Sequence, residues 1–247
     1  QASYITWMRP ARELQVGASG GIITINENNS TEARGPANTM VGFQASEGAS
    51  RVKPPLIGGS TLYWTRDGRH VREFKYDFGT DSYDSDDLSV LSSHVLPARV
   101  THAAFASSPD SVAWMCLPGA EDGYRLVGLT FNKSQEVTAY HPHKIGGNGI
   151  PISVGVIPNA DGQDEVWFAV KRNINGADVC YIERFALPAT TGNDPIKEYP
   201  DCHIVYSGTA SIEVNGVDHL EGETVQVMAP LWCSHPDAIV GGGTVTL

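Results

Sequence analysis

The chain has 247 residues, of which 41% are apolar and 18% are charged, a balance typical of a folded globular protein and not of a disordered one. Lysine and arginine total 17 against 28 aspartate and glutamate residues, and the formal net charge of -11 argues against a surface that neutralises nucleic-acid phosphates. The apolar runs are only a few residues long, which excludes a membrane-spanning helix of about 20 residues.

Short runs rich in β-branched and aromatic residues, bounded by Gly, Pro, Asn and Asp, recur along the chain and predict strands. The clearest candidates, in chain order, are residues 61–65, 111–116, 124–131, 165–171 and 179–185. One stretch, residues 85–94, has modest helical character and is expected to form a short helix or a loop. The sequence therefore predicts an all-β protein.

Tryptophans recur at nearly even spacing, because Trp7, Trp64, Trp114 and Trp167 are separated by 57, 50 and 53 residues. After the last three, an Asx-Gly turn leads into a second β run, which predicts a hairpin each time. Several strands in each period of about 40 to 50 residues are typical of propeller blades. We predict about four β-propeller-type blades, with the blade number of the intact protein left open and a β-sandwich as the structural alternative.

The regular pattern breaks where prolines and polar residues gather between residues 187 and 199. We therefore predict a blade region at residues 1–190, a linker at 191–206 and a small C-terminal β module at 207–247. The chain opens at Gln1 without an initiator methionine and ends on a strand-like run, from which we expect a fragment or a processed product.

Two of the predicted units carry similar charged pairs on their returning strands. Arg72-Glu73 stands in one unit and Glu183-Arg184 stands at the matching place in another. A repeated structural ion pair between blades explains this better than an active site does. With Trp64, Trp114 and Trp167, these four residues form the predicted structural motif.

Several stretches resemble one family of phage tail proteins. They are residues 64–83, 86–89 with His94, 108–114, 126–131, 135–137, 164–167, 172–176, 181–184, 216–225 and 241–247. The first reads WTRDGRHVREFKYDFGTDSY, and the last two read GVDHLEGETV and GGGTVTL. These stretches cover nearly the whole chain in order. The chain departs from the family pattern at residues 26–39, which are more polar, and upstream blades are missing.

The family that these stretches resemble is the tail nozzle, or tail tubular, protein of short-tailed phages (podoviruses). The resemblance implies a non-enzymatic structural protein of the virion tail, made in the cytoplasm of the host bacterium. It also implies a homo-oligomer, hexameric in the intact tail, which contacts other tail and adaptor proteins and lets phage DNA pass without specific binding. No cofactor is expected.

Oxygen ligands are richest in the acidic stretch that begins at Asp77. Asp81, Asp84 and Asp86 are weak candidates for a Ca²⁺ site, but the stretch lacks the order of ligands found in an EF-hand. We expect a solvated, turn-forming loop. An alternative function, a propeller-fold glycan-active enzyme, would use Asp84 and Asp87 as acid and base. A third is a receptor-binding or adhesin module of the tail.

Other candidate sites carry less weight. In His141-Pro142-His143 the proline is expected to splay the two imidazoles, so a zinc site is not predicted. The widely scattered cysteines are expected to be buried free thiols. The sequence contains no Gly-x-Ser-x-Gly elbow, and its glycine-rich segments open no predicted helix, so neither a serine hydrolase nor a nucleotide-binding site is indicated.

Overall fold

A computed structural model of the chain describes residues 3–27, 35–121, 123–186, 202–229 and 233–247. Within these ranges the regular structure consists of 21 strands and three short 3-10 helices, which confirms the all-β prediction. None of the helices in the described ranges has the length and apolarity needed to cross a membrane. The predicted break at residues 187–199 lies outside the described residues, as does most of the predicted linker.

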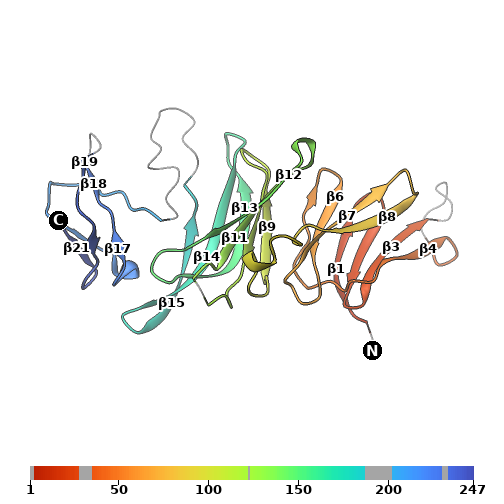
Figure 1. Cartoon of the computed structure of the whole chain (residues 1–247), viewed down its shortest axis with the longest axis horizontal. Coiled ribbons are helices and arrows are strands. Elements are labelled where there is room, and N and C mark those ends of the chain that lie inside the picture. Colours follow the sequence, from red (N-terminus) through yellow and green to blue (C-terminus); the bar gives the residue numbers. More distant parts are fainter. Residues whose placement is uncertain (1–2, 28–34, 122, 187–201, 230–232) are drawn as a thin grey trace.

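Consecutive strands form four antiparallel meanders, which we call blades 1 to 4 (Figure 1). Blade 1 contains β1 (Ile5–Pro10), β2 (Leu14–Ala18), β3 (Gly21–Glu27) and β4 (Thr39–Ala45). Blade 2 contains β5 (Leu56–Ile57), β6 (Ser60–Trp64), β7 (Val71–Asp77) and β8 (Ser82–Asp87). Blade 3 contains β9 (His102–Ala106), β10 (Val112–Cys116), β11 (Leu126–Asn132) and β12 (Val137–His143). Blade 4 contains β13 (Ile150–Pro158), β14 (Asp164–Ile174) and β15 (Ala177–Arg184).

The blades follow one another along the long axis of the molecule in a propeller-like stack that forms an open row (Figure 1). Three apolar cores hold neighbouring blades together. Trp7 of blade 1 packs with Tyr63 of blade 2, and their ring centroids are 6.2 Å apart. Leu62 and Trp64 of blade 2 pack against blade 3. Each core joins two adjacent sheets, so burial of apolar side chains between blades is the main stabilising term.

Each blade has two distinct faces because side chains alternate along a strand. We call the face turned toward the following blade the forward face and the opposite one the back face. Trp7, Trp64 and Trp114 all lie on forward faces and are packed against the next blade. Trp167 lies on the face of blade 4 opposite Phe168, and Phe168 contacts blade 3, so Trp167 also lies on a forward face.

The predicted hairpins are present at the Asx-Gly turns that can be compared. Asp67 and Gly68 lie between β6 and β7, and Asn175 and Gly176 lie between β14 and β15. Asn175 and Gly176 have φ of 51° and 84°, the left-handed geometry of a type I′ turn, for which Asn-Gly is the preferred pair.

After the region around residues 187–201, the chain forms a separate C-terminal module of three two-stranded sheets. Its strands are β16 (Glu213–Asn215), β17 (Thr224–Val225), β18 (Met228–Ala229), β19 (Cys233–Ser234), β20 (Ala238–Ile239) and β21 (Thr244–Thr246). A small core of Val217, Leu220, Val240 and Val245 holds the module together. A 3-10 helix, η3 (Asp218–Leu220), lies against β14 of blade 4.

Two local predictions were right only in part. Residues 85–94 are expected to form a short helix or a loop; residues 88–92 form a turn and η1 (Ser93–Val95) is helical, but residues 85–87 complete β8. Residues 85–87 pair with β7, so pairing within the sheet overrides the modest helical preference of these three residues. Cys116 is a buried free thiol as expected, whereas Cys180 and Cys202 are free and exposed.

Candidate functional site

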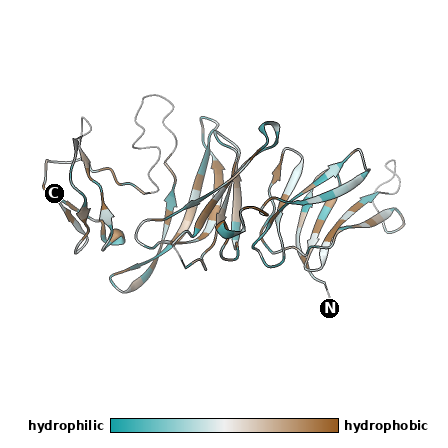
Figure 2. Cartoon of the chain, in the orientation of Figure 1, coloured by the Kyte–Doolittle hydropathy of each residue, from teal (hydrophilic) through white to brown (hydrophobic). Residues whose placement is uncertain are grey.

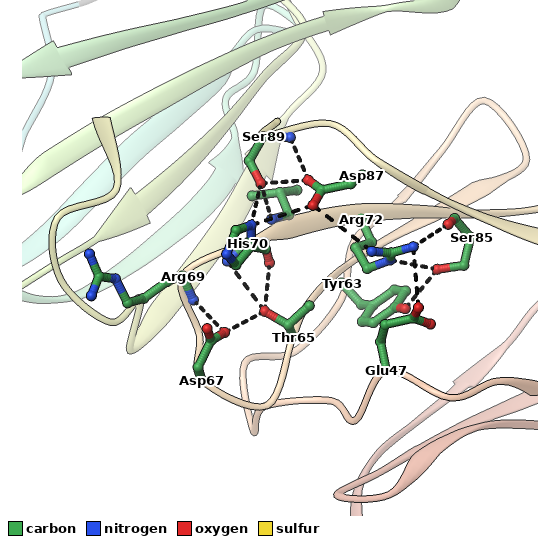
Figure 3. A network of polar contacts seen from close by, with 11 residues as sticks. Glu47, Tyr63, Thr65, Asp67, Arg69, His70, Arg72, Ser85, Asp87 and Ser89 are labelled. Carbon is green, nitrogen blue, oxygen red and sulfur yellow. Dashed lines mark hydrogen bonds and ion pairs between the residues drawn. The ribbon is translucent and has the colours of Figure 1, made fainter. Parts of the chain in front are cut away.

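A connected network of polar side chains lies on blade 2 and in the loops beside it (Figure 3). Its first part shapes the turn between β6 and β7. The hydroxyl of Thr65 donates to Asp67 at 2.5 Å, and the amide of Arg69 donates to the same carboxylate at 3.1 Å. Burial acts to raise the pKa of Asp67, but the hydrogen bonds from Thr65 and Arg69 outweigh it and hold the pKa below its usual value.

The second part joins His70, Asp87 and Ser89, three residue types found in hydrolase triads. The Ser89 hydroxyl donates directly to Asp87 at 2.7 Å and lies 3.3 Å from Nδ1 of His70. That same Nδ1 is 3.4 Å from the other oxygen of Asp87. In a catalytic triad the imidazole stands between serine and carboxylate and uses both ring nitrogens. Here Ser89 is fully buried and bonded to the carboxylate, so the trio fixes the end of β8 and forms no nucleophile.

The third part centres on Arg72 and reaches toward blade 1. Its guanidinium donates to the hydroxyl and the carbonyl oxygen of Ser85 at 2.9 and 2.5 Å. It also forms an ion pair with Glu47, in the segment that follows blade 1, at 3.6 Å. Tyr63 shares a hydrogen bond of 2.8 Å with Ser85, and burial raises the pKa of this phenol, which keeps it protonated. The network therefore links β6, β7 and β8 to the neighbouring blade.

The predicted acidic stretch is divided between two faces of one hairpin. Asp84 pairs with Lys75 in the register and Asp87 pairs with Arg72, so the two carboxylates lie on opposite faces of β8. Asp84 and Asp87 therefore do not form a pair of carboxylates that flanks one glycosidic bond.

The three weak metal candidates, Asp81, Asp84 and Asp86, do not form a metal-binding cluster with other described residues. Asp81 accepts a hydrogen bond from the hydroxyl of Tyr76, and Asp86 accepts one from Lys75 at 2.5 Å. Asp84 shares a face with Asp86. Among the described residues, the structure contains no cluster of three or more His, Cys, Asp or Glu side chains that could hold a metal ion.

The charged pairs of the predicted structural motif have different partners in the two blades. Glu73 is almost fully buried and binds Lys133, which belongs to η2 (Lys133–Gln135) of blade 3. This ion pair lies between blades. Glu183 instead accepts two hydrogen bonds from Arg172 at 2.7 and 2.9 Å, and Arg184 binds Glu165 at 2.7 Å. Both of these pairs lie within blade 4.

His141 and His143 lie on the forward face of blade 3. Nδ1 of His141 and Nε2 of His143 are 2.7 Å apart, so one ring donates a hydrogen bond to the other. The expectation that Pro142 splays the rings was wrong, because residues two apart in a strand share a face. Both rings pack against Trp114, and His143 also packs near Phe185 of blade 4. The pair is part of the joint between blades 3 and 4.

A groove of about 280 Å³ separates blade 4 from the C-terminal module. Its lining includes Lys171, Arg172 and Asp178 from blade 4 and Asp218, His219 and Glu221 from the module. Burial lowers the pKa of His219, and the charge of Arg172 lowers it further. Most of the lining residues are polar or charged, and they carry both signs of charge.

Sequence reasoning missed this junction because its residues are far apart in the chain. The available signal was the glycine-rich segment at residues 146–149, which was judged only as a nucleotide-binding loop. Gly147 has φ of 66°, and a Cβ there would overlap the carbonyl oxygen of His219. The glycine is therefore required for close approach of the module.

Comparisons with protein-family models and with curated proteins find no match to this chain. Its function is therefore argued from its own residues. The polar groups described above hold turns, strands and neighbouring blades together.

Proposed function

We propose that the chain is a structural component of a bacteriophage virion, part of the wall of the tail nozzle through which DNA leaves. The observation that carries this proposal is the stack of four blades, joined by continuous apolar cores. Candidate reactive groups such as Ser89, His70 and Asp87 are engaged with one another in fixing the end of β8. A stiff β wall needs many such fixed contacts and no reactive centre.

The order of the resembling stretches supports the same assignment. Residues 64–89 fall on blade 2, residues 108–137 on blade 3, residues 164–184 on blade 4, and residues 216–247 in the C-terminal module. Each of these ranges thus overlaps one structural unit in part. In the intact tail we propose a hexamer of this protein in contact with other tail and adaptor proteins.

The charge of the chain suits a conduit for DNA. A protein that neutralised phosphates would release counterions, bind DNA tightly and slow its passage. A formal net charge of -11 opposes such binding. Calculation of the electrostatic potential of an assembled ring tests this argument, since a basic lumen would contradict it.

Immunogold electron microscopy tests the location directly. Antibodies raised against residues 207–247 are applied to virions released from cells that carry the gene for this chain. We expect gold at the distal end of a short tail. Unlabelled virions, or gold on the capsid, would overturn the proposal. Virions probed with antibodies to a major capsid protein provide the control for access and orientation.

A further inference from the structure

One face of blade 1 is apolar across all four strands. The strand register places two rows of side chains on this back face: Met8, Val16, Ile23 and Phe43 in one, and Pro10, Leu14, Ile25 and Val41 in the other. Val16 is buried among its neighbours, whereas Met8, Val41 and Phe43 are 62%, 63% and 64% exposed. Figure 2 shows hydrophobic residues among hydrophilic ones along the strands of blade 1. An apolar surface of this extent is typical of an interaction site.

The forward face of blade 4 lies at the other end of the stack and carries Trp167. Its neighbours on this face include Ile157, which is 58% exposed, and Ile182, which is 71% exposed. Arg184 lies over the indole at 5.3 Å from the ring centroid, and the indole nitrogen donates to Glu165 at 3.2 Å. The C-terminal module approaches the far end of β14, beside Arg172, and leaves Ile157 and Ile182 exposed and Trp167 half-buried.

The three joints inside the molecule share one chemistry. In each, a forward face that carries tryptophan meets an apolar back face: Trp7 meets Tyr63 and Phe74, Trp64 meets Met115 and Leu129, and Trp114 meets Phe168 and Phe185. Blade 4 offers a forward face with tryptophan, and blade 1 offers an apolar back face. The two open faces are therefore the two halves of a fourth joint of the same kind.

We propose that the forward face of blade 4 in one copy packs against the back face of blade 1 in a second copy, head to tail. The joint continues the stacking already present within the chain. It is heterologous, so repeated use gives a closed ring or an open filament. The register also places one carboxylate on this face, that of Glu27 opposite Thr39 at the end of β3; Glu27 is exposed, so the apolar rows can be buried while its carboxylate stays in water. This inference rests on the pattern of the three joints and not on the tail location.

Two single substitutions block the two faces separately. Phe43→Glu places a charge on the back face of blade 1, and Ile182→Glu places one on the forward face of blade 4. Both residues are exposed in one copy, so the fold of each variant is expected to survive. Leu91→Glu, in the loop after blade 2, is the matched control because Leu91 is 90% exposed and lies on neither face.

Sedimentation velocity from about 1 to about 100 μM measures the association. We expect the mass of the unmodified protein and of Leu91→Glu to rise with concentration, while each blocking variant alone stays monomeric. An equimolar mixture of the two blocking variants should form a dimer, since one intact joint remains between them. The appearance of this dimer also shows that both variants are folded.

Two results would overturn the proposal. One is an unmodified protein that stays monomeric at the highest concentration. The other is an Ile182→Glu variant that associates as the unmodified protein does, which would show that blade 1 pairs with a second blade 1. Immunogold labelling at the tail would stand in either case, so this failure is distinct from failure of the proposed function.

Discussion

Arg172 and Glu73 carry charges at positions where only 3% and 4% of the residue surface is exposed. Such charges are stable in a protein only when an opposite charge and hydrogen bonds replace the lost water. Glu183 does this for Arg172 with two hydrogen bonds, and the carbonyl oxygen of Gly146 accepts a third. At the scale of single residues, the stability of the fold therefore depends on the pairs Arg172–Glu183 and Glu73–Lys133.

Loss of Glu183 should destabilise the protein more than loss of Arg184. Glu183→Ala leaves a buried guanidinium without its carboxylate, for which we expect a loss of about 1 to 3 kcal/mol in the free energy of unfolding. Arg184→Ala breaks a pair whose arginine side chain is 43% exposed, for which we expect about 0 to 1 kcal/mol. Urea unfolding of both variants measures the difference. Equal losses would contradict the assigned role of Glu183.

The carboxylate of Asp164 should make the folding stability of the protein fall at acid pH. Burial acts to raise the pKa of Asp164, but hydrogen bonds from Ser107 and Ser108 outweigh it and hold the pKa below the usual 3.8. The stabilising effect is therefore complete above pH 3.8 and is lost as the pH falls through the lowered pKa. We expect Asp164→Asn to be less stable at neutral pH and to lose less stability on acidification. Thermal unfolding across this pH range checks both effects, and parallel curves would contradict them.

At the scale of elements, much of the fold could be predicted. Runs such as residues 61–65 and 111–116 are short and almost continuously apolar, as a strand buried on both faces requires, and they lie at β6 and β10. The Asn-Gly pair at residues 175–176 predicted a hairpin because its backbone needs positive φ. Residues 85–87 could not be assigned, since their strand depends on pairing with β7.

The candidate site was less predictable than the strands. Sequence spacing identified Glu73 as a structural residue but could not reveal Lys133, which lies 60 residues away and in another blade. Likewise, alternation along a strand shows that Asp84 and Asp87 take opposite faces only once β8 is known to be a strand. Contacts between distant segments depend on how the sheets stack on one another, and that stacking cannot be predicted from a single sequence.

The junction between blade 4 and the C-terminal module should be sensitive to one glycine. Gly147→Ala adds a Cβ that overlaps the backbone of His219, at a residue with φ of 66°. We expect the module to detach, and limited proteolysis should cleave between residues 187 and 206 faster than in the unmodified protein. Gly162→Ala is the matched control, because φ there is 78° and nothing lies within 4 Å of the new Cβ. Equal cleavage of the two variants would contradict this account.

At the scale of the whole molecule, the excess of carboxylates should keep the protein off DNA. With 28 acidic residues against 17 basic ones, we expect no detectable binding to duplex DNA at about 0.15 M salt. Fluorescence anisotropy with a labelled duplex measures this. Binding that weakens steeply as salt is added would reveal a local basic surface and would contradict the proposed conduit.

Each blade is built from consecutive strands, and each apolar core described above joins two adjacent blades. A molecule of this kind behaves as a nearly one-dimensional chain of units, in which stability is the sum of each unit and its contacts with its neighbours. Pulling on one end would therefore detach the blades one after another and spare those still stacked. The protein would lose its structure in steps and absorb work at each one, whereas a single core would fail all at once.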